Sequence, residues 1–360
     1  MAVDTQDIAA TREEAERFEL EPLIVVDALS EHLARELPGD DAPLEFERIG
    51  EGHSNITYLV RRGGDRFVLR RPPRGPLPPS AHDVLREWRI LDAIKDTPAR
   101  SPRTLLACAD ESVIGAPFYV MEYVEGAVIT GEIPGPLDTP EEHRRMGLDL
   151  VDALAEVHAV DWRACGLESF GKPTGYLERQ VKRFTGLWEY NKTREVPRVQ
   201  EMRDWLADNM PDSREATIVH GDYRLGNTMV AHDPPARLIA IFDWELSTIG
   251  DPLADLGYMT VTWIQPGDPA DTMFSSLSAV TRSEGFPSRD ELVAYYEERT
   301  GRPMSALNWY QALALWKAAV FMEGNYKRSL AGTTDDPFLK MFDEGVPALA
   351  EAAYEASRAG

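Results

Sequence analysis

The sequence predicts an α+β protein with two lobes, a small β-rich N-lobe and a larger, mostly helical C-lobe. Five strand-like runs and one inserted helix fall within about 100 residues after Leu44. After Gly126, apolar residues recur mainly at helical spacing. The chain has 360 residues, and a chain of this length usually forms two domains or lobes.

The N-terminal part is expected to begin with a helix and to continue as a sheet. Residues 22–37 carry apolar side chains at helical spacing, and Pro38-Gly39 ends that pattern. The expected strands are residues 46–50, 56–61, 66–71, 104–109 and 117–123, with a helix over 82–94. We therefore divide the chain into an N-terminal helical extension (1–43), an N-lobe (44–125) and a helical C-lobe (126–360).

Helices dominate the predicted C-lobe. Thr139-Pro140-Glu141-Glu142 is a capping box with proline at the first helical position, and the helix it starts ends near His158. Further helices are expected over 176–191, 199–209, 253–264, 289–299, 304–330 and 338–357. A pair of short strands (217–219 and 229–230) and a third run (238–242) interrupt these helices. The densest cluster of polar residues lies on these strands, so the functional site is expected there.

Composition and charge exclude several classes of function. The chain has 38 Lys+Arg against 61 Asp+Glu, a net charge of −23 that argues against nucleic-acid binding. The longest apolar stretches, such as 312–322, are too short to span a membrane, and the polar N-terminus lacks the apolar core of a secretory signal. Cys108 and Cys165 provide neither a disulfide framework nor a zinc site. These features predict a cytoplasmic protein that binds neither membranes nor nucleic acid.

The strongest local pattern is His220-Gly221-Asp222 with Asn227 five residues later, followed by a second apolar strand that ends in Asp243-Trp244-Glu245. Phosphoryl transfer from a metal-bound nucleotide needs a carboxylate that orients or deprotonates the attacking hydroxyl. It also needs a carboxylate and an amide oxygen to hold Mg²⁺ on the phosphates. Each of these residues alone is typical of an ordinary turn. The spacing of all three after apolar strands favours a phosphoryl-transfer site.

This pattern, His-Gly-Asp-x-x-x-x-Asn and then an apolar strand ending in Asp-x-Glu, resembles the aminoglycoside phosphotransferase and choline kinase family. The resemblance extends from about Leu44 to the C-terminal helices and implies the bilobal protein-kinase-like fold. It implies that Asp222 is the catalytic base. It also implies that Asn227 and Asp243 bind Mg²⁺.

A second segment of the family follows the catalytic pattern. Residues 250–256 match its Gly-Asp-Pro-x-x-Asp-Leu motif, in which the acidic residues mainly brace the catalytic loop. The resemblance therefore implies structural support by Asp251 and Asp255. We expect the same role for His220, with a general-base role as the alternative.

The N-lobe carries a candidate phosphate loop. Gly50, Gly52, Ser54 and Asn55 lie between the first two strands, where glycines let the backbone approach a nucleotide and polar groups can donate to phosphate oxygens. Gly-x-Gly alone also suits any β-turn. A dinucleotide-binding motif of the Rossmann type is disfavoured, because that motif needs a following helix and residues 56–60 resemble a strand.

Arg70, on the third strand, occupies the position where kinase-like folds generally have a lysine that pairs with phosphates. Arginine keeps the positive charge but differs from lysine in shape and reach. Arg71 takes this role if the strand register differs by one residue. Glu87, on the following helix, is placed to pair with the cation, and a solvated surface pair is the alternative interpretation.

Residues 118–126 fit the hinge that follows the last strand of the N-lobe. There the adenine would bond to backbone groups from Glu122 to Val124. A buried strand that enters a turn explains the same residues, since backbone recognition leaves little trace in side chains.

The combined motifs imply an enzyme that uses ATP or GTP with Mg²⁺ to phosphorylate the hydroxyl group of a small molecule, such as an aminoglycoside or another amino or hydroxy metabolite. A nucleotide-binding pseudokinase scaffold is one alternative, and a protein kinase is disfavoured because the motif has His-Gly-Asp in place of His-Arg-Asp. Residues 67–73 and 243–245 also resemble phosphotransferase domains associated with acyl-CoA dehydrogenases, which suggests a hydroxyacyl acceptor.

The acceptor pocket is expected among the helix 176–190, the segment 257–265 and the helix that bears Trp316. These segments contain Trp188, Trp263, Glu323 and Tyr326. Aromatic faces beside carboxylates suit a cationic acceptor. Core packing of these aromatic residues is the alternative.

Overall fold

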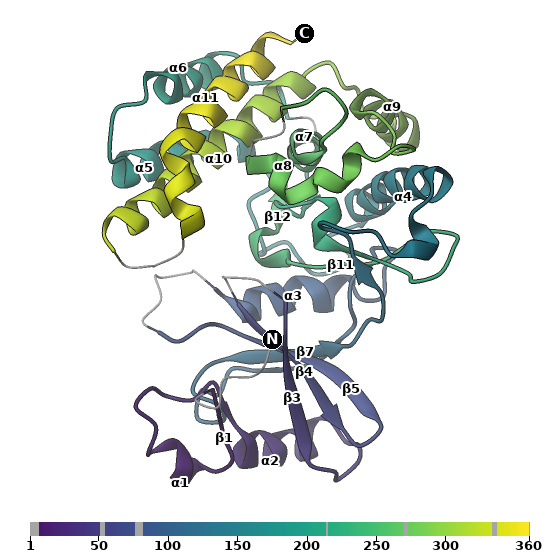
Figure 1. The fold of residues 1–360 in the computed structure, drawn as a ribbon, viewed down its shortest axis with the longest axis vertical. Coiled ribbons are helices and arrows are strands. Elements are labelled where there is room, and N and C mark those ends of the chain that lie inside the picture. The colour runs from purple at the N-terminus through teal and green to yellow at the C-terminus, as the bar shows by residue number, and fades with distance from the viewer. Residues whose placement is uncertain are drawn as a thin grey trace. The chain divides into compact units, whose positions relative to one another are not determined.

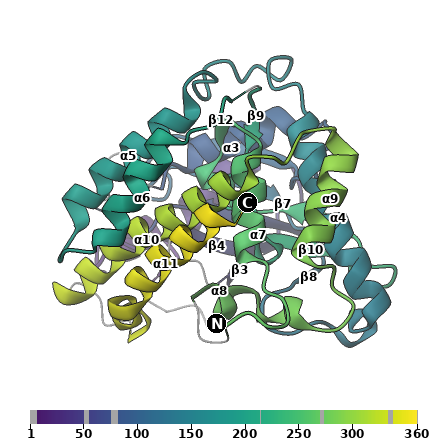
Figure 2. The same ribbon diagram turned by 90° about the horizontal axis from the view of Figure 1, so that it is seen from above.

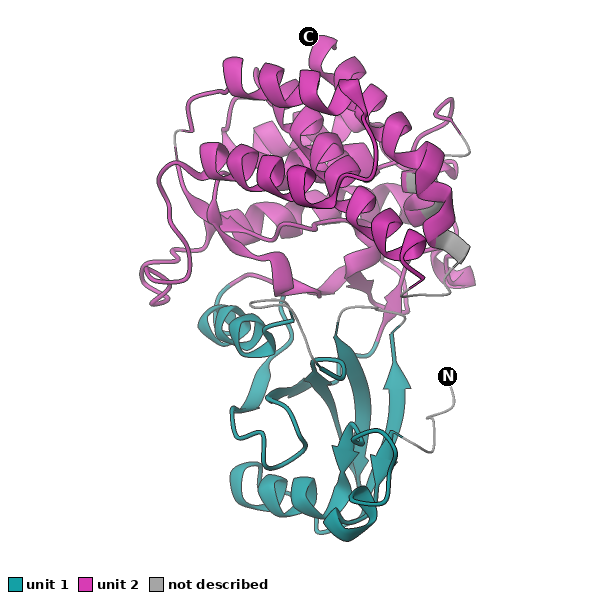
Figure 3. Ribbon diagram, turned by 90° about the vertical axis from the view of Figure 1, so that its left-hand side faces the viewer, with its two compact units in different colours: residues 1–97, 101–125 teal, residues 98–100, 126–360 magenta. Residues whose placement is uncertain are grey.

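The computed structural model describes residues 7–50, 55–75, 82–213, 215–269, 273–332 and 337–359. The chain divides into two units, which Figure 3 shows in different colours. Unit 1 comprises residues 1–97 and 101–125, and unit 2 comprises residues 98–100 and 126–360. Unit 1 contains a sheet and unit 2 is mostly helical, which confirms the predicted α+β class.

Unit 1 is built on a five-stranded antiparallel sheet with the strand order β3-β4-β5-β7-β6 (Figure 1). The strands are β3 (Leu44–Ile49), β4 (Ile56–Arg62), β5 (Asp65–Arg71), β6 (Thr104–Cys108) and β7 (Phe118–Glu122). The helix α3 (Val84–Ile94) follows β5 in the chain and packs on β6 and β7. All five strands and this helix begin and end within two residues of the predicted positions.

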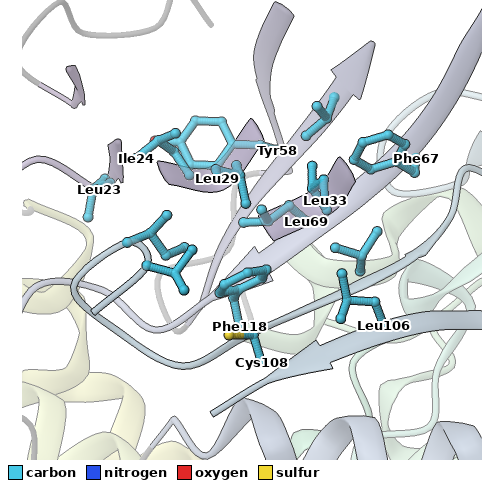
Figure 4. Close-up of a cluster of buried hydrophobic side chains, with 14 of the residues drawn as sticks. Leu23, Ile24, Leu29, Leu33, Tyr58, Phe67, Leu69, Leu106, Cys108 and Phe118 are labelled. Carbon is cyan, nitrogen blue, oxygen red and sulfur yellow. The ribbon is translucent and has the colours of Figure 1, made fainter. Parts of the chain in front are cut away.

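The core of unit 1 lies on the face of this sheet that α2 (Val26–Glu36) covers. Alternate residues of the strands, such as Tyr58 and Val60 or Phe67 and Leu69, are buried there together with leucines of α2 (Figure 4). The N-terminal segment therefore belongs to the same core as the sheet. It also contains a short helix α1 (Arg12–Ala15) and the paired strands β1 (Ile8–Ala9) and β2 (Ile24–Val25). The helix predicted over 22–37 begins only at Val26, because Ile24 and Val25 pair with β1.

Helices form most of unit 2. They are α4 (Pro140–Ala159), α5 (Tyr176–Asn191), α6 (Pro197–Asp208), α7 (Leu253–Thr262), α8 (Met273–Ser278), α9 (Arg289–Thr300), α10 (Leu307–Leu330) and α11 (Phe342–Arg358). The long helix α10 runs beside α11 and also packs against α5, α6 and α7 (Figure 2). Only half of the capping box predicted for α4 is present: Thr139 Oγ1 accepts a hydrogen bond from the Glu142 amide (3.4 Å), but the Glu142 carboxylate accepts from the Ala236 amide and does not bond to the Thr139 amide. None of the described helices is both long enough and apolar enough to cross a membrane.

Short strands connect these helices. The strand β9 (Thr217–Val219) pairs with β12 (Thr248–Gly250), and β10 (Thr228–Val230) lies between β8 (Ala127–Val128) and β11 (Leu238–Ile241). The interpretation of 217–219 and 229–230 as a pair was wrong, because each strand has partners in a different sheet. The loop between them, residues 220–227, contains the predicted catalytic residues.

Candidate active site

The loop after β9 brings Asp222 and Asn227 into direct contact. Asn227 Nδ2 donates to both the backbone oxygen and the Oδ2 atom of Asp222, each at 2.8 Å. The amide is 8% exposed, and its Oδ1 atom accepts no hydrogen bond from any described residue. These contacts fix the orientation of the Asp222 carboxylate and leave an amide oxygen for another ligand.

Asp243 lies at the same end of the β10–β11 hairpin as Asn227. Thr228 pairs with Ile241, and the Phe242 amide donates to the Asn227 backbone oxygen (2.8 Å). The φ angle of Asp243 is 65°, in the left-handed region that few residues other than glycine adopt. Strained positions of this kind persist where the surrounding structure fixes them, and they are frequent at functional sites.

The residues at this hairpin end fit a Mg²⁺ ion. Mg²⁺ prefers hard oxygen ligands and keeps several of its waters, so one or two protein ligands are enough. The Oδ1 atom of Asn227 and the carboxylate of Asp243 provide this donor set. Asn227 and Asp243 are also the two residues that the family resemblance implies as Mg²⁺ ligands.

A buried carboxylate from α7 holds the backbone of the catalytic loop. Asp255 is fully buried, and its two oxygens accept hydrogen bonds from the amides of His220 and Gly221, both at 2.7 Å. His158 Nε2 donates to the same carboxylate (3.2 Å). Burial alone would raise the pKa of Asp255, but these hydrogen bonds and the nearby histidines lower it below its ordinary value. The bracing role predicted for Asp255 therefore agrees with its contacts.

Gly221 is required by the path of this loop. Its φ is +88°, and a Cβ atom there would lie 2.8 Å from the Leu246 backbone oxygen. Any other residue would be strained and would clash with the segment after β11.

His220 is fully buried, and both of its ring nitrogens face backbone groups. Nε2 donates to the Phe242 oxygen (2.9 Å), and Nδ1 accepts from the Asp222 amide (3.3 Å). The ring also packs against Trp244, with 4.8 Å between ring centroids. This geometry agrees with a bracing role and leaves no nitrogen for the general-base alternative.

Asp251 contributes a second brace. Its Oδ1 atom accepts from the Leu253 amide (3.0 Å), and its Oδ2 atom accepts from the Tyr310 hydroxyl of α10 (2.9 Å). Asp251 therefore joins the start of α7 to α10, as expected for a structural residue.

Two further groups at Asp222 were not singled out from the sequence. Tyr258 of α7 feels the charge of Asp222: burial, followed by that charge, raises the pKa of Tyr258 well above its ordinary value. Tyr258 therefore stays protonated. Arg224 Nε lies 4.0 Å from Asp222 Oδ1. The sequence feature that could have indicated Tyr258 is its position three residues after Asp255, which places the two side chains one turn apart on α7.

In unit 1, Arg70 and Glu87 form the ion pair that the sequence predicted. Arg70 Nε donates to Glu87 Oε2 (2.8 Å), and Arg70 Nη1 donates to Thr57 Oγ1 (3.3 Å). The Glu87 side chain is only 2% exposed, so the pair is not a solvated surface pair. The phosphate contact of Arg70 stays a prediction.

Arg71 points into a different environment. Its guanidinium is buried and donates to the backbone oxygens of Leu23 and Ile114, the latter at 2.9 Å. Burial lowers the pKa of Arg71 to about 10. These contacts make Arg71 a structural residue and favour Arg70 as the phosphate ligand.

The candidate phosphate loop is described only at its two ends. Gly50 has a φ of +78°, and Asn55 is buried at the start of β4. Gly52 and Ser54 lie outside the described residues. The phosphate-binding role of the loop stays a prediction.

The hinge candidates follow the end of β7. The Glu122 amide donates to the Arg103 oxygen (2.9 Å), so this amide is already engaged. The Val124 amide and carbonyl make no hydrogen bond to other described residues. The backbone of Val124 therefore has the capacity to bond to a nucleotide base.

The aromatic and acidic residues expected around the acceptor belong to the helical core. Trp188, Trp263, Trp316 and Glu323 are 3%, 2%, 0% and 0% exposed. Trp316 Nε1 donates to a backbone oxygen (3.0 Å), and Glu323 Oε1 accepts from both the amide and the hydroxyl of Thr193. The expectation that these residues form a cation-binding pocket was wrong, because their side chains are buried in the core. Helical spacing could not distinguish the two cases, since it marks a buried face whether that face lines a pocket or a core.

Comparison with known proteins places the chain in a family. A model of the phosphotransferase enzyme family matches residues 45–292, and the chain belongs to this family. This confirms the predicted aminoglycoside phosphotransferase relationship and its kinase-like fold.

Individual relatives extend this result. The chain is 35% identical over 341 residues to acyl-CoA dehydrogenase family member 11 of Rattus norvegicus, a match that covers 92% of the chain and 43% of the rat protein. The chain therefore spans less than half the length of that relative. A crystal structure of a candidate aminoglycoside phosphotransferase from Ralstonia eutropha has a TM-score of 0.78 and 32% identity, and the match covers 92% of this chain and 98% of that one.

A more distant structure shares the fold alone. Aminoglycoside phosphotransferase APH(4)-Ia, in a ternary complex with AMP-PNP and hygromycin B, has a TM-score of 0.58 at 15% identity. The match covers 92% of this chain and 99% of that one.

Proposed function

We propose that this phosphotransferase is an ATP-dependent kinase that transfers the γ-phosphoryl group to the hydroxyl of a small molecule. The observation that carries the proposal is the fixed Asp222 carboxylate. Asn227 orients it, and Asp255 holds the loop that bears it. A base held in this way needs little reorganisation when the hydroxyl arrives.

The proposed step is an in-line displacement at the γ-phosphorus. The acceptor oxygen forms a bond to phosphorus while the bond from phosphorus to the β–γ bridging oxygen breaks. The hydroxyl proton passes to Asp222, and the products are the phosphate ester and ADP. Asn227 and Asp243 would hold Mg²⁺, which neutralises charge on the phosphates.

Unit 1 would bind the nucleotide. Arg70, held by Glu87, would contact phosphate oxygens, and the backbone of residues 50–55 would donate to them. The backbone of Val124 would bond to the base. The fold relative that carries AMP-PNP supports nucleotide use by a chain with this fold.

The test of this function is Asp222→Asn. Turnover of ATP with an accepted alcohol should fall by at least about 10²-fold, while nucleotide affinity stays close to that of the wild type. Asp212→Asn makes the same change on the exposed surface and should leave both quantities unchanged. Near-normal turnover by Asp222→Asn would eliminate the assignment. Nucleotide binding without turnover by the wild type on any acceptor would favour the pseudokinase scaffold.

Two acceptor classes follow from the relatives. Aminoglycosides are suggested by the name of the Ralstonia protein, and a hydroxyacyl compound is suggested by the name of the rat protein. The aromatic and acidic residues that supported a cationic acceptor are in the core, which removes that argument for aminoglycosides. A screen of ADP release with both classes of compound decides between them.

A further inference from the structure

Arg224 lies in the catalytic loop, two residues after Asp222. Its Nε atom is 4.0 Å from Oδ1 of Asp222, which is the carboxylate oxygen to which Asn227 does not donate. The side chains of Arg224 and Asp222 are 18% and 24% exposed, so both are partly accessible to a ligand. Oδ1 has the capacity to accept the proton of an acceptor hydroxyl, and the guanidinium of Arg224 lies beside it.

The backbone of the loop and one glycine determine where this guanidinium lies. The chain turns directly after Arg224, because the Asn227 amide donates to the Arg224 backbone oxygen (2.9 Å) and closes the turn Leu225–Asn227. A Cβ atom on Gly226 would overlap Nη1 of Arg224 and would lie 3.3 Å from its Cζ atom. The guanidinium therefore folds back over residue 226, in space that is open because this residue is a glycine.

The guanidinium of Arg224 keeps its donors available for a ligand. Arg302, whose side chain is similarly exposed at 17%, donates to Glu215, to the Tyr296 hydroxyl (3.5 Å) and to the His158 backbone oxygen (3.4 Å). Arg224 donates a hydrogen bond to no residue in the part of the chain that the structure describes. Withdrawing a cation from water without hydrogen-bond partners is costly. An anion with oxygen atoms beside the catalytic base would supply these partners.

The transferred phosphoryl group has to pass close to these atoms if Asp222 is the base. An acceptor hydroxyl that is hydrogen-bonded to Asp222 lies about 2.7 Å from a carboxylate oxygen. Its oxygen atom attacks a phosphorus that is about 3–3.5 Å away in the reactive complex. The negative phosphoryl oxygens repel the carboxylate, and a cation 4.0 Å from that carboxylate offsets the repulsion. The planar guanidinium also matches two phosphoryl oxygens at once.

We propose that Arg224 is a further catalytic residue, which binds the oxygens of the γ-phosphoryl group while this group passes to the acceptor. The bond from the acceptor oxygen to phosphorus forms as the bond to the β–γ bridging oxygen breaks, and the hydroxyl proton goes to Asp222. Arg224 exchanges no proton in this step and supplies only hydrogen bonds and charge. This inference rests on the proposed kinase function with Asp222 as its base.

The experiment measures the binding of the nucleotide and of a mimic of the transferred group. ADP with Mg²⁺ is titrated calorimetrically in the absence and in the presence of aluminium fluoride, which takes the place of that group. Arg224→Met removes the charge, and Arg224→Lys keeps the charge without the planar guanidinium. Arg237→Met is the matched control, because Arg237 is exposed in the turn between β10 and β11.

Aluminium fluoride should raise the affinity of the wild type for ADP. Arg224→Met should reduce this gain at least about tenfold and leave the affinity for ADP alone unchanged, because ADP lacks the group that Arg224 binds. The slow release of ADP from ATP without an acceptor, in which water is the attacking group, should fall by a similar factor. Arg224→Lys should retain part of both quantities, and Arg237→Met should match the wild type.

Gly226→Ala tests the position of the guanidinium without removing it. The added methyl group would displace Nη1 of Arg224, so this variant should lose part of the gain that aluminium fluoride gives. When Arg224→Met is already present, Gly226→Ala should have little further effect on this gain, because the group that it displaces is absent. Effects of the two substitutions that simply add would contradict the assigned position of the guanidinium.

Two outcomes would overturn this inference and leave the kinase function standing. One is a full gain from aluminium fluoride in Arg224→Met, and the other is wild-type ADP release by that variant while Asp222→Asn is inactive. If Arg224→Met weakened the binding of ADP alone by the same factor, Arg224 would bind the nucleotide and not the transferred group. A wild type that gains no affinity from aluminium fluoride and releases no ADP with any acceptor would contradict the kinase function and this inference together.

Discussion

Asp243 offers a direct test of the metal site, because its left-handed backbone conformation restricts which substitutions are informative. Asparagine, like aspartate, tolerates this left-handed conformation. Asp243→Asn therefore removes the charge with little added strain. We expect Mg²⁺-dependent nucleotide affinity to fall at least about tenfold, and the melting temperature to change by only a few degrees.

Calorimetry with and without Mg²⁺ measures this effect. Asp233→Asn, an exposed change in the turn between β10 and β11, serves as the control. If Asp243→Asn bound Mg²⁺ and nucleotide like the wild type, the metal would have to be held elsewhere.

His158 should make stability depend on pH. Burial is the largest influence on its ring and lowers the pKa of His158 below 6.5, despite the hydrogen bond to Asp255. Below pH 6.5 the unfolded chain therefore binds a proton that the native protein does not. The free energy of unfolding should fall as pH drops below 6.5, by up to about 1.4 kcal/mol per pH unit from this residue.

Urea unfolding between pH 7.5 and about pH 5 checks this prediction. His158→Gln should lower stability at neutral pH and make its pH dependence shallower, while His232→Gln on the exposed surface should change neither. If the stability of His158→Gln depended on pH as steeply as that of the wild type, other titratable groups would have to cause the dependence.

The residues of the site differ in how far the sequence could predict them. Asp222 and Asn227 interact within one loop, so their spacing alone indicated the contact. Tyr258 acts on Asp222 only because its helix α7 binds the catalytic loop through Asp255, and no local pattern records that packing. Trp316 shows the converse problem, since its position on a helical face is equally consistent with a pocket and with a core.

Among the secondary-structure elements, α7 and α10 define the geometry around the catalytic loop, and glycine permits their close contact. Gly257→Ala would place a Cβ atom 2.8 Å from the backbone of Tyr310. We expect a loss of about 1–3 kcal/mol in the free energy of unfolding, because backbone atoms cannot move aside cheaply.

Gly186→Ala on α5 is the matched control. A Cβ atom there has no neighbour within 4 Å, so this change should stabilise the protein by up to about 1 kcal/mol through helix propensity. Chemical denaturation of both variants measures the difference. Equal effects of the two substitutions would mean that the helices separate easily.

Elements with a long regular pattern were predictable, and the shortest elements were not. The helix 176–191 was predicted to the residue, since sixteen residues carry enough apolar periodicity. The strand β12 has only three residues and no pattern of its own. It forms because β9 needs a partner, which is a property of the tertiary structure. Its absence from the prediction led to the incorrect pairing of β9 with β10.

At the scale of the whole molecule, Arg100 belongs to one unit although the chain on both sides of residues 98–100 belongs to the other. It lies between α3 and β6, both in unit 1, but residues 98–100 belong to unit 2. Its guanidinium donates to Asp149 (2.7 Å) and to Glu156 (2.8 and 2.9 Å), and also to the Leu238 backbone oxygen (2.9 Å). Burial opposes the charged form, but these carboxylates raise the pKa of Arg100 above its ordinary value.

Arg100→Ala should therefore lower the free energy of unfolding of unit 2 by about 1–3 kcal/mol, since two partly exposed carboxylates would lose their cation while Asp149 keeps the Leu238 amide. Arg103→Ala removes an exposed arginine three residues away and should cost less than about 1 kcal/mol. Thermal unfolding of both variants provides the measurement. Equal melting temperatures would show that Arg100 adds nothing to unit 2.

Because residues 98–100 belong to unit 2, a cut between residues 125 and 126 does not separate the two units cleanly. A fragment that starts at residue 126 would lack the guanidinium that joins α4 to β11, and it would lack the Arg100 oxygen that accepts from the Ile241 amide (2.6 Å). A fragment that ends at residue 125 would carry a cationic loop without its acidic partners. A single cut after residue 125 therefore removes contacts from the interior of unit 2, whereas unit 1 keeps its own core. We therefore expect unit 2 to be less stable when it is expressed from residue 126 than it is within the whole chain.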